Sequence, residues 1–334
     1  MELIVRNVNH AFAEIFWQMK NLNLQVEQTR NGPAYVLPDL VVTKYLFPTE
    51  RVLFHPARDA NPIFHLMESI WMLAGRKDVA FLSQFNKNMV NFSDDGVEFN
   101  AAYGYRWRKH FGRDQLDDVI MLLRRDPSTR QAVIQIWDTD DLQKKTKDKA
   151  CNTQLVFDTR GQMLNMTVFN RSNDIWWGAY GANAVHFSFL QEFVSHALKL
   201  PVGVYRQVSN NLHLYTELYN ASEYVKKPPV AVDFDLYSKG VVKPKPIMTN
   251  SDHRLFLTEC EMFCENPFNE TLRYENVFFE KVARPMALIS LARKSKTENG
   301  YKIAKQINAE DWKRAVVMWI DKRESIKQGG EVKK

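Results

Sequence analysis

The chain has little cysteine, and the cysteines that it has are irregularly spaced. They are Cys151, Cys260 and Cys264. An odd, small number at such spacing does not fit a disulfide framework, which needs an even set. Cys260 and Cys264 lie four residues apart, but no nearby pair of Cys or His completes a zinc-like spacing. We therefore expect these two to be buried thiols, and we expect no metal site.

Long apolar runs are lacking as well. No segment is apolar for long enough to span a membrane, and the N-terminal stretch lacks the basic start and clean apolar run of a secretory signal. These absences predict a cytoplasmic protein with reduced thiols and no membrane partner. The chain also has no internal repeats and no clear linker. A single α+β domain over residues 1–334 is therefore favoured.

Apolar and aromatic side chains are abundant. Of the 334 residues, 45% are hydrophobic, and 21 Phe, 12 Tyr and 8 Trp contribute to them. This content suits a folded globular protein with one large core or two modest ones. The formal net charge is +6, which is mild for this length. Nucleic-acid binding, a pocket for an anionic small molecule and an ordinary basic surface are all compatible with it.

The spacing of apolar residues predicts helices mixed with strands. Apolar positions between Ala11 and Met19 recur at three- and four-residue steps, which is typical of an amphipathic helix. Helices are expected at 9–22, 62–75, 79–91, 115–125, 183–199 and 309–325, the second of them ending at Gly75. Strands are expected within 34–55, at 131–137, twice within 151–171, at 202–217, and as a pair near 254–262 and 272–283.

Cys151 draws attention through its neighbours. A lone cysteine is more often a buried apolar residue than a nucleophile. Twenty residues further on, the segment 170–174 (NRSND) combines an Arg, a hydroxyl, an amide and a carboxylate. An Arg beside a cysteine lowers the pKa of the thiol and can hold a phosphate through two parallel hydrogen bonds. The alternative is a polar turn between a strand and a helix.

Five ordered motifs lie between residues 65 and 215. They read MESIWMLAG, YGYRWR, DPSTRQAVIQIW, ACNTQLVFDTRGQMLNMTVFNRSNDIWWGAYGANAVHF and NNLHLY. Their order and content resemble the thymidylate synthase superfamily, which includes nucleotide hydroxymethylases known from bacteriophages and nucleoside antibiotic pathways. Residues 1–60 and 220–334 match this superfamily weakly. The resemblance implies an α+β fold in which a large twisted mixed sheet is packed by helices and uses one face for dimerisation.

The same resemblance implies a reaction at a pyrimidine nucleoside monophosphate. C6 of the ring is a Michael acceptor, and a thiolate that adds there makes C5 a carbon nucleophile. In this family C5 then attacks the methylene of methylenetetrahydrofolate, a cosubstrate. The match identifies Cys151 as the nucleophile. It makes Glu68 the general acid or base, and it gives Tyr103 a part in removing the C5 proton.

The arginines would bind the phosphate. The match assigns this role to Arg171, with Ser172 beside it, and to Arg130, which in the family reaches the site from the second subunit of a homodimer. Gln131 stands where the family has a second Arg. Arg30 is a further phosphate ligand on a weaker match, and a solvated loop Arg is its alternative.

Base and ribose recognition follow from the downstream motifs. Asn183 and Ala182 compete for the position that reads the pyrimidine, and the spacing to His213 favours Asn183 with one residue inserted at 179–181. An Asn amide suits uracil, so dUMP is favoured over dCMP. His213 and Tyr215 share a strand face and would hold the ribose, although ordinary strand packing is the alternative.

Folate recognition would involve three side chains. Asp174 matches the carboxylate that binds the pterin ring, and Met89 falls near the place of a family Trp. Trp71 is a second candidate for folate contact, or it only packs the core.

The final step can be a reduction or a hydration. Reduction needs a dry pocket, whereas hydration admits water. Residues 85–96 contain no Trp where synthases have two, Asn152 replaces the synthase His, and Asn210-Asn211 replaces its Gly-Asp. These departures favour hydroxymethylation over the reductive methylation of a thymidylate synthase. A non-catalytic nucleotide-binding relative is a remote alternative, and no direct nucleic-acid contact is expected. A viral source would place the enzyme in the host cytoplasm.

Overall fold

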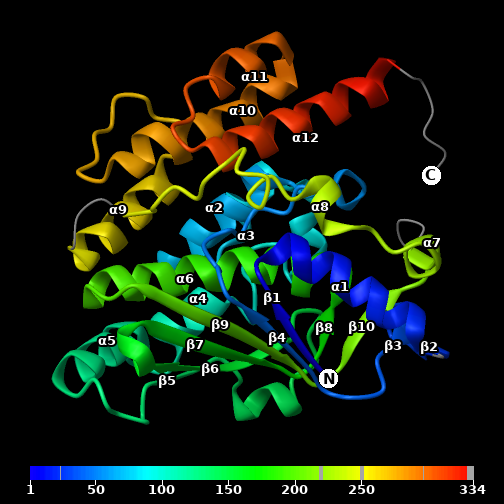
Figure 1. The fold of residues 1–334 in the computed structure, drawn as a ribbon. Helices are drawn as coiled ribbons and strands as arrows, with labels where there is room; N and C mark the ends of the chain where they lie inside the picture. The colour runs from blue at the N-terminus through cyan, green and yellow to red at the C-terminus, as the bar shows by residue number, and fades with distance from the viewer. Residues whose placement is uncertain (23, 218–220, 249–251, 296, 329–334) are drawn as a thin grey trace.

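The computed structural model describes residues 1–334 except 23, 218–220, 249–251, 296 and 329–334. Strands and helices alternate in its N-terminal two thirds, and helices dominate the remainder (Figure 1). The strands are β1 (Glu2–Val5), β2 (Val26–Thr29), β3 (Gly32–Val36), β4 (Val41–Tyr45), β5 (Val133–Gln135), β6 (Asn152–Asp158), β7 (Leu164–Asn170), β8 (Asn173–Asp174), β9 (Val202–Ser209) and β10 (Leu212–Tyr215).

The helices cover much of the sheet and form the upper layers in Figure 1. They are α1 (Val8–Asn21), α2 (Pro62–Leu73), α3 (Val79–Phe85), α4 (Tyr103–Tyr105), α5 (Gln115–Arg125), α6 (Asn183–Leu198), α7 (Ala221–Lys226), α8 (Ala231–Phe234), α9 (His253–Glu265), α10 (Arg284–Ser295), α11 (Thr297–Ala304) and α12 (Glu310–Gln328). The mixture of helices and strands confirms the predicted α+β class.

The main sheet has the strand order β1-β4-β9-β7-β6-β5, and a smaller sheet has the order β2-β3-β10-β8. The main sheet is mixed, because β1 with β4 and β7 with β9 run parallel while the other pairs are antiparallel. In the smaller sheet, β8 runs parallel to β10. The main sheet therefore agrees with the predicted large mixed sheet.

One face of the main sheet packs against the helices. Tyr45 on β4 stacks on Tyr205 of β9 with ring centroids 5.1 Å apart. On the same face, Gln207 donates to the carbonyl of Ala179, and the hydroxyls of Thr43 and Tyr180 lie 3.0 Å apart. These contacts tie the sheet to the segment that leads into α6, and so fix where that helix begins.

The opposite face of the main sheet is less covered. Val156, Phe169 and Val208 are half-buried there, and they alternate with buried residues along β6, β7 and β9. At the two edges of the sheet, Ile4 is 58% exposed and Val133 is 41% exposed. Apolar side chains of this kind on a sheet surface favour burial against another surface.

The C-terminal region differs from its prediction. Residues 254–262 form part of helix α9, where a strand was expected. Residues 272–276 form a loop, and 277–278 are already helical before the π-helical turn at Phe279–Ala283. Asp252 caps α9 by accepting hydrogen bonds from the backbone of Arg254 and Leu255. Apolar residues at helical spacing, including the predicted buried thiols Cys260 and Cys264, form its buried face.

Two further boundaries differ from the sequence-based prediction. The helix expected at 79–91 stops at Phe85, because the side chain of Asn86 accepts from the backbone of Asn88 and starts a separate 3-10 turn at Lys87–Phe92. The strand expected at 202–217 is divided into β9 and β10 at Asn210-Asn211. The terminal helix predicted near 309–325 is confirmed by α12.

Helix α4 approaches α2 closely, and a glycine permits it. A Cβ on Gly104 would lie 1.9 Å from the carbonyl oxygen of Met72, so no larger residue fits without moving the backbone. Because Tyr103 precedes this glycine, the close approach also sets where the Tyr103 ring lies.

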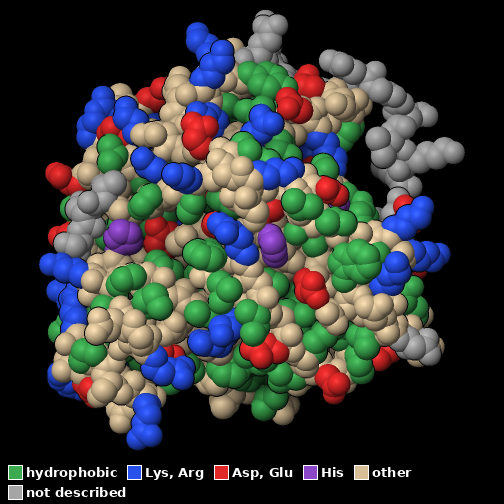
Figure 2. All heavy atoms as spheres, viewed as in Figure 1, with side chains coloured by type: hydrophobic (Ala, Val, Ile, Leu, Met, Phe, Trp, Pro, Cys, Tyr) green, Lys and Arg blue, Asp and Glu red, His purple; other side chains and the backbone are tan. Residues whose placement is uncertain are grey.

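Charged side chains of both signs cover the visible surface, and long apolar helices are absent among the described residues. None of the helices there is both long and apolar enough to cross a membrane. Figure 2 shows Lys and Arg interspersed with Asp and Glu over the face that it presents. In that part of the chain, no group of three or more His, Cys, Asp or Glu side chains has a metal-binding arrangement.

Candidate active site

The pairing of β6 with β7 sets Cys151 beside Arg171. The antiparallel register pairs Asn152 with Asn170, so the residue before β6 meets the residue after β7. The backbone N–H of Arg171 donates to the carbonyl of Cys151 at 2.9 Å. The Arg171 guanidinium donates to the carbonyl of Ala150 at 2.8 Å, and its Nη2 lies 3.9 Å from the Cys151 Sγ. The guanidinium also lies over the ring of Trp137.

The ionisation of Cys151 depends on a balance between burial and charge. Burial raises the pKa of the Cys151 thiol, and the nearby carboxylates of Asp148 and Asp174 act in the same direction. The positive charges of Arg171 and, more weakly, Arg30 lower it. Each cation at this site therefore favours the thiolate, which is the nucleophilic form.

Tyr103 contacts the same cysteine from α4. Its hydroxyl accepts a hydrogen bond from the backbone N–H of Cys151 at 3.3 Å, and its ring stacks on Phe187. Burial raises the pKa of the Tyr103 phenol well above its usual value, as do the charges of Cys151 and Asp148. The phenol is therefore protonated near neutral pH and has a proton to donate.

Asn183 is the first residue of α6 and is 7% exposed. Its Nδ2 donates to Oδ1 of Asn173 at 3.1 Å, and Asn173 in turn donates to Ser209 on β9. The segment before it, Ile175–Ala182, is π-helical. The insertion predicted at 179–181 falls within this segment, where the backbone of Tyr180 and Gly181 is not helical, and it stays a prediction.

Asp174 and His213 lie opposite each other because β8 pairs with β10. One carboxylate oxygen of Asp174 accepts from the backbone of Trp177, while its Oδ2 is buried without a hydrogen-bond partner among the described residues. Burial raises the pKa of Asp174, and the Trp177 N–H and the charge of His213 act against this. A buried acceptor without a partner fits a ligand that brings an N–H donor.

The small sheet brings the predicted ribose residues near the Arg30 loop. The ring of His213 meets that of Tyr215 edge-on at 5.0 Å, and its Nδ1 lies 2.9 Å from Oδ1 of Asn211. The Tyr215 hydroxyl accepts from Nδ2 of Asn31 at 3.3 Å. This contact joins the Arg30 loop to β10, and the charge of Arg30 acts weakly on the Cys151 thiol.

Glu68 meets a partner that the sequence did not reveal. Its carboxylate oxygen on α2 lies 3.1 Å from Nε2 of His186 on α6. His186 follows Asn183 by three residues, so both side chains are on one face of α6. In the sequence, this three-residue spacing could have identified His186 as a site residue, but a His on an apolar helix is usually a core residue.

Comparisons with known proteins agree with this geometry. Residues 58–238 match the family model of thymidylate synthase. A deoxyuridylate hydroxymethyltransferase of Pseudomonas phage M6 is 41% identical over 330 residues, which cover 95% of this chain and 93% of that protein. The chain belongs to the thymidylate synthase family.

Other relatives agree with this assignment. A deoxyuridylate hydroxymethyltransferase of Bacillus phage SP01 is 39% identical over 245 residues, covering 66% of this chain and 63% of that protein. The crystal structure of thymidylate synthase from T4 phage has the same fold, with a TM-score of 0.55 and 20% identity over 66% of this chain and 81% of that one. This member of the thymidylate synthase family is a one-carbon transferase.

Not every residue predicted from the family motifs lies in this cluster. Arg130 is exposed in the turn between α5 and β5, and it is not among the principal charges that act on Cys151. Trp71 is 3% exposed, with its Nε1 donating to Asp78, which supports the alternative that it packs the core. Met89 is half-buried in the 3-10 turn, and Ser172 is half-buried beside Arg171. Their roles stay predictions.

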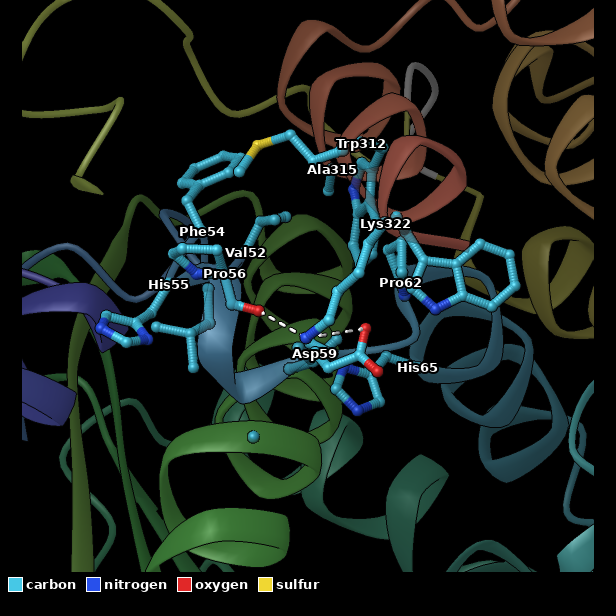
Figure 3. A pocket seen from close by; sticks show the side chains of 16 residues that line it. Val52, Phe54, His55, Pro56, Asp59, Pro62, His65, Trp312, Ala315 and Lys322 are labelled. Atoms are coloured by element: carbon cyan, nitrogen blue, oxygen red, sulfur yellow. Dashed lines mark hydrogen bonds and ion pairs between the residues drawn. The ribbon is translucent and has the colours of Figure 1, made fainter. Parts of the chain in front are cut away.

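A pocket lies beside the site, next to the C-terminal helix α12 (Figure 3). It encloses about 640 Å³ of empty space, counting the part open to solvent, between residues 52–62, α12 and the start of α6. Lys322 reaches from α12 to the carbonyl of Pro56 at 3.0 Å and to Asp59 at 3.7 Å. His65, one turn before Glu68 on α2, lines the same pocket.

Replacing Arg171 tests the charge balance at Cys151. We expect Arg171→Met to move the pH dependence of Cys151 alkylation by iodoacetamide to higher pH by about one pH unit, because the thiolate loses its nearest cation. Peptide mass spectrometry follows the modification of Cys151 separately from that of Cys260 and Cys264.

Arg160→Met is the matched control, because Arg160 is exposed at the β6–β7 turn and pairs with Asp158. If the pH dependence of Cys151 alkylation is the same in Arg171→Met and in the wild type, the role of the Arg171 charge is contradicted.

Proposed function

We propose that the enzyme transfers a hydroxymethyl group to C5 of dUMP, with methylenetetrahydrofolate as the one-carbon donor. The observation that carries this proposal is the 41% identity to a deoxyuridylate hydroxymethyltransferase over almost the whole chain, together with the Cys151–Arg171 pair. The alternative is a thymidylate synthase, which reduces the same intermediate. The clustering of a thiol with charged and hydrogen-bonding groups argues against a non-catalytic relative.

The first step is addition of the Cys151 thiolate to C6 of the pyrimidine. The new S–C6 bond forms as the electron pair of the C5=C6 bond moves to C5 and O4. Arg171, with Arg30 and Ser172 nearby, holds the 5′-phosphate so that C6 meets the sulfur. His213 and Tyr215 hold the ribose. These contacts hold C6 of the base next to the sulfur of Cys151, so the two atoms are already oriented for bond formation.

Asn183 reads the base. Uracil offers an acceptor at O4 and a donor at N3, which match the Nδ2 and Oδ1 of an amide. One hydrogen on Nδ2 of Asn183 is used by Asn173, which leaves the second for O4. Cytosine has the opposite donor and acceptor pattern at these atoms, so the anchored amide favours dUMP over dCMP.

Folate binding is proposed at Asp174. Its partnerless Oδ2 fits the N–H groups of a pterin ring. The folate supplies the one-carbon unit to C5, and Met89 would contact it from the 3-10 turn. Removal of the C5 proton, with cleavage of the bond between the methylene carbon and the folate nitrogen, would release tetrahydrofolate and leave an exocyclic methylene on the nucleotide. The protonated phenol of Tyr103 lies beside the nucleophile. Glu68 would be the general acid or base in this step.

A homodimer is proposed because the main sheet leaves apolar side chains half-buried on one face. Val156, Phe169 and Val208 are such residues. Pairing two such faces would bury them. Arg130, exposed in the chain described here, would reach the phosphate of the second subunit. Because the relatives come from phages, we also propose that the enzyme acts in the cytoplasm of an infected host.

The product of the reaction tests the proposed function. Purified enzyme with dUMP and methylenetetrahydrofolate is expected to give 5-hydroxymethyl-dUMP and no absorbance rise from dihydrofolate, because water and not hydride reaches the methylene. Mass spectrometry of parallel reactions with dUMP and dCMP identifies the substrate. Cys151→Ser should bind dUMP but not turn it over. Formation of dTMP with dihydrofolate would support the synthase instead.

A mixing experiment tests the shared site. Cys151→Ser and Arg130→Glu homodimers should each be nearly inactive, but a fully exchanged equal mixture should recover about a quarter of the wild-type activity. Half of the dimers are then mixed, and each mixed dimer has one intact site. Arg160→Glu, an exposed arginine at the β6–β7 turn, is the control and should be active alone. No recovery after proven subunit exchange would contradict a donated Arg130.

A further inference from the structure

The Glu68–His186 contact lies beside the proposed base-binding residue. The side chain of His186 is 4% exposed and that of Glu68 is 17% exposed, so water screens their interaction only weakly. The two atoms that meet, Oε2 and Nε2, are 3.1 Å apart. The contact is an ion-pair distance without hydrogen-bond alignment, and Asn183 begins the same turn of α6 as His186, so the pair lies next to the residue proposed to bind the base.

Other groups face His186 from α2 and from the segment before it. His65 meets the His186 ring at right angles with centroids 6.2 Å apart. Burial lowers the pKa of His65 well below its usual value, and the charges of Arg58 and His186 act in the same direction. His65 is therefore neutral near pH 7. Arg58 is a buried cation whose charge acts on His65.

We propose that His186 is a positioning residue that orients the Glu68 carboxylate to take a proton from the water that attacks the exocyclic methylene. This inference rests on the proposed hydroxymethyl transfer. Under this inference, a residue on α6 that the family motifs did not identify helps water, rather than hydride, to react with the methylene.

The step balances without any oxidant. The water oxygen forms a C–O bond to the methylene carbon, and the electron pair of the exocyclic C=C bond moves to C5 and O4. One proton of that water passes to Glu68. The electron pair at C5 then re-forms the C5=C6 bond, and the S–C6 bond breaks to release the Cys151 thiolate. The proton on Glu68 returns to solvent, for which the pocket lined by His65 offers a nearby exit.

His186→Gln is the test variant, and His196→Gln is its matched control. His196 is on the same helix and lies 3.8 Å from Glu192, but it is remote from Asn183 and Glu68 and more exposed. Both substitutions replace a His beside a Glu by a neutral amide. Steady-state kinetics of 5-hydroxymethyl-dUMP formation, the Kd for dUMP and the midpoint of thermal unfolding are measured for both.

We expect His186→Gln to lower kcat by about tenfold or more, with the Kd for dUMP unchanged. His196→Gln should match the wild type in each measurement.

Three results would overturn the inference. Hydroxymethyl product from the wild type with an unchanged kcat in His186→Gln rejects it while leaving the proposed function intact. A parallel loss of dUMP affinity and thermal stability in that variant makes His186 structural only. If the wild-type enzyme forms dTMP, no water attacks the methylene, and both proposals are rejected.

Discussion

The site depends on the antiparallel pairing of β6 with β7. This pairing fixes the residue before one strand against the residue after the other, so the Cys151 thiol and the Arg171 guanidinium meet without either being on a flexible loop. The backbone N–H of Arg171 donates to Cys151, and its side chain donates to Ala150. These two hydrogen bonds hold the guanidinium in place. The parallel β8–β10 pair then adds Asp174 and His213 beside them.

Burial and charge oppose each other at this thiol. The surroundings that exclude water and favour C–C bond formation also raise the pKa of Cys151, so the site needs cations to restore the thiolate. Arg171 and Arg30 supply part of that charge within one chain. An arginine donated by a second subunit would supply more and would bind the phosphate too. Dimerisation in this account therefore serves the chemistry as well as stability.

From motif order, the sequence predicts Cys151 as the nucleophile and Arg171 as its arginine, and the structure brings these two side chains together. Their neighbourhood depends on one local strand pair, β6 with β7. Residues 254–262 were wrongly predicted as a strand, because buried apolar residues on a short segment suit either structure until its cap at Asp252 is recognised. His186 was missed because its partner Glu68 lies on another helix, and no local pattern reports a tertiary contact.

The most direct measurement is the mass of the enzyme after incubation with 5-fluoro-dUMP and methylenetetrahydrofolate. Fluorine at C5 cannot leave as a proton does, so the nucleotide should stay attached to the sulfur after the one-carbon unit is added. The account predicts a covalent adduct that maps to the peptide containing Cys151 and is absent in Cys151→Ser. No adduct, or one located on Cys260 or Cys264, would contradict it.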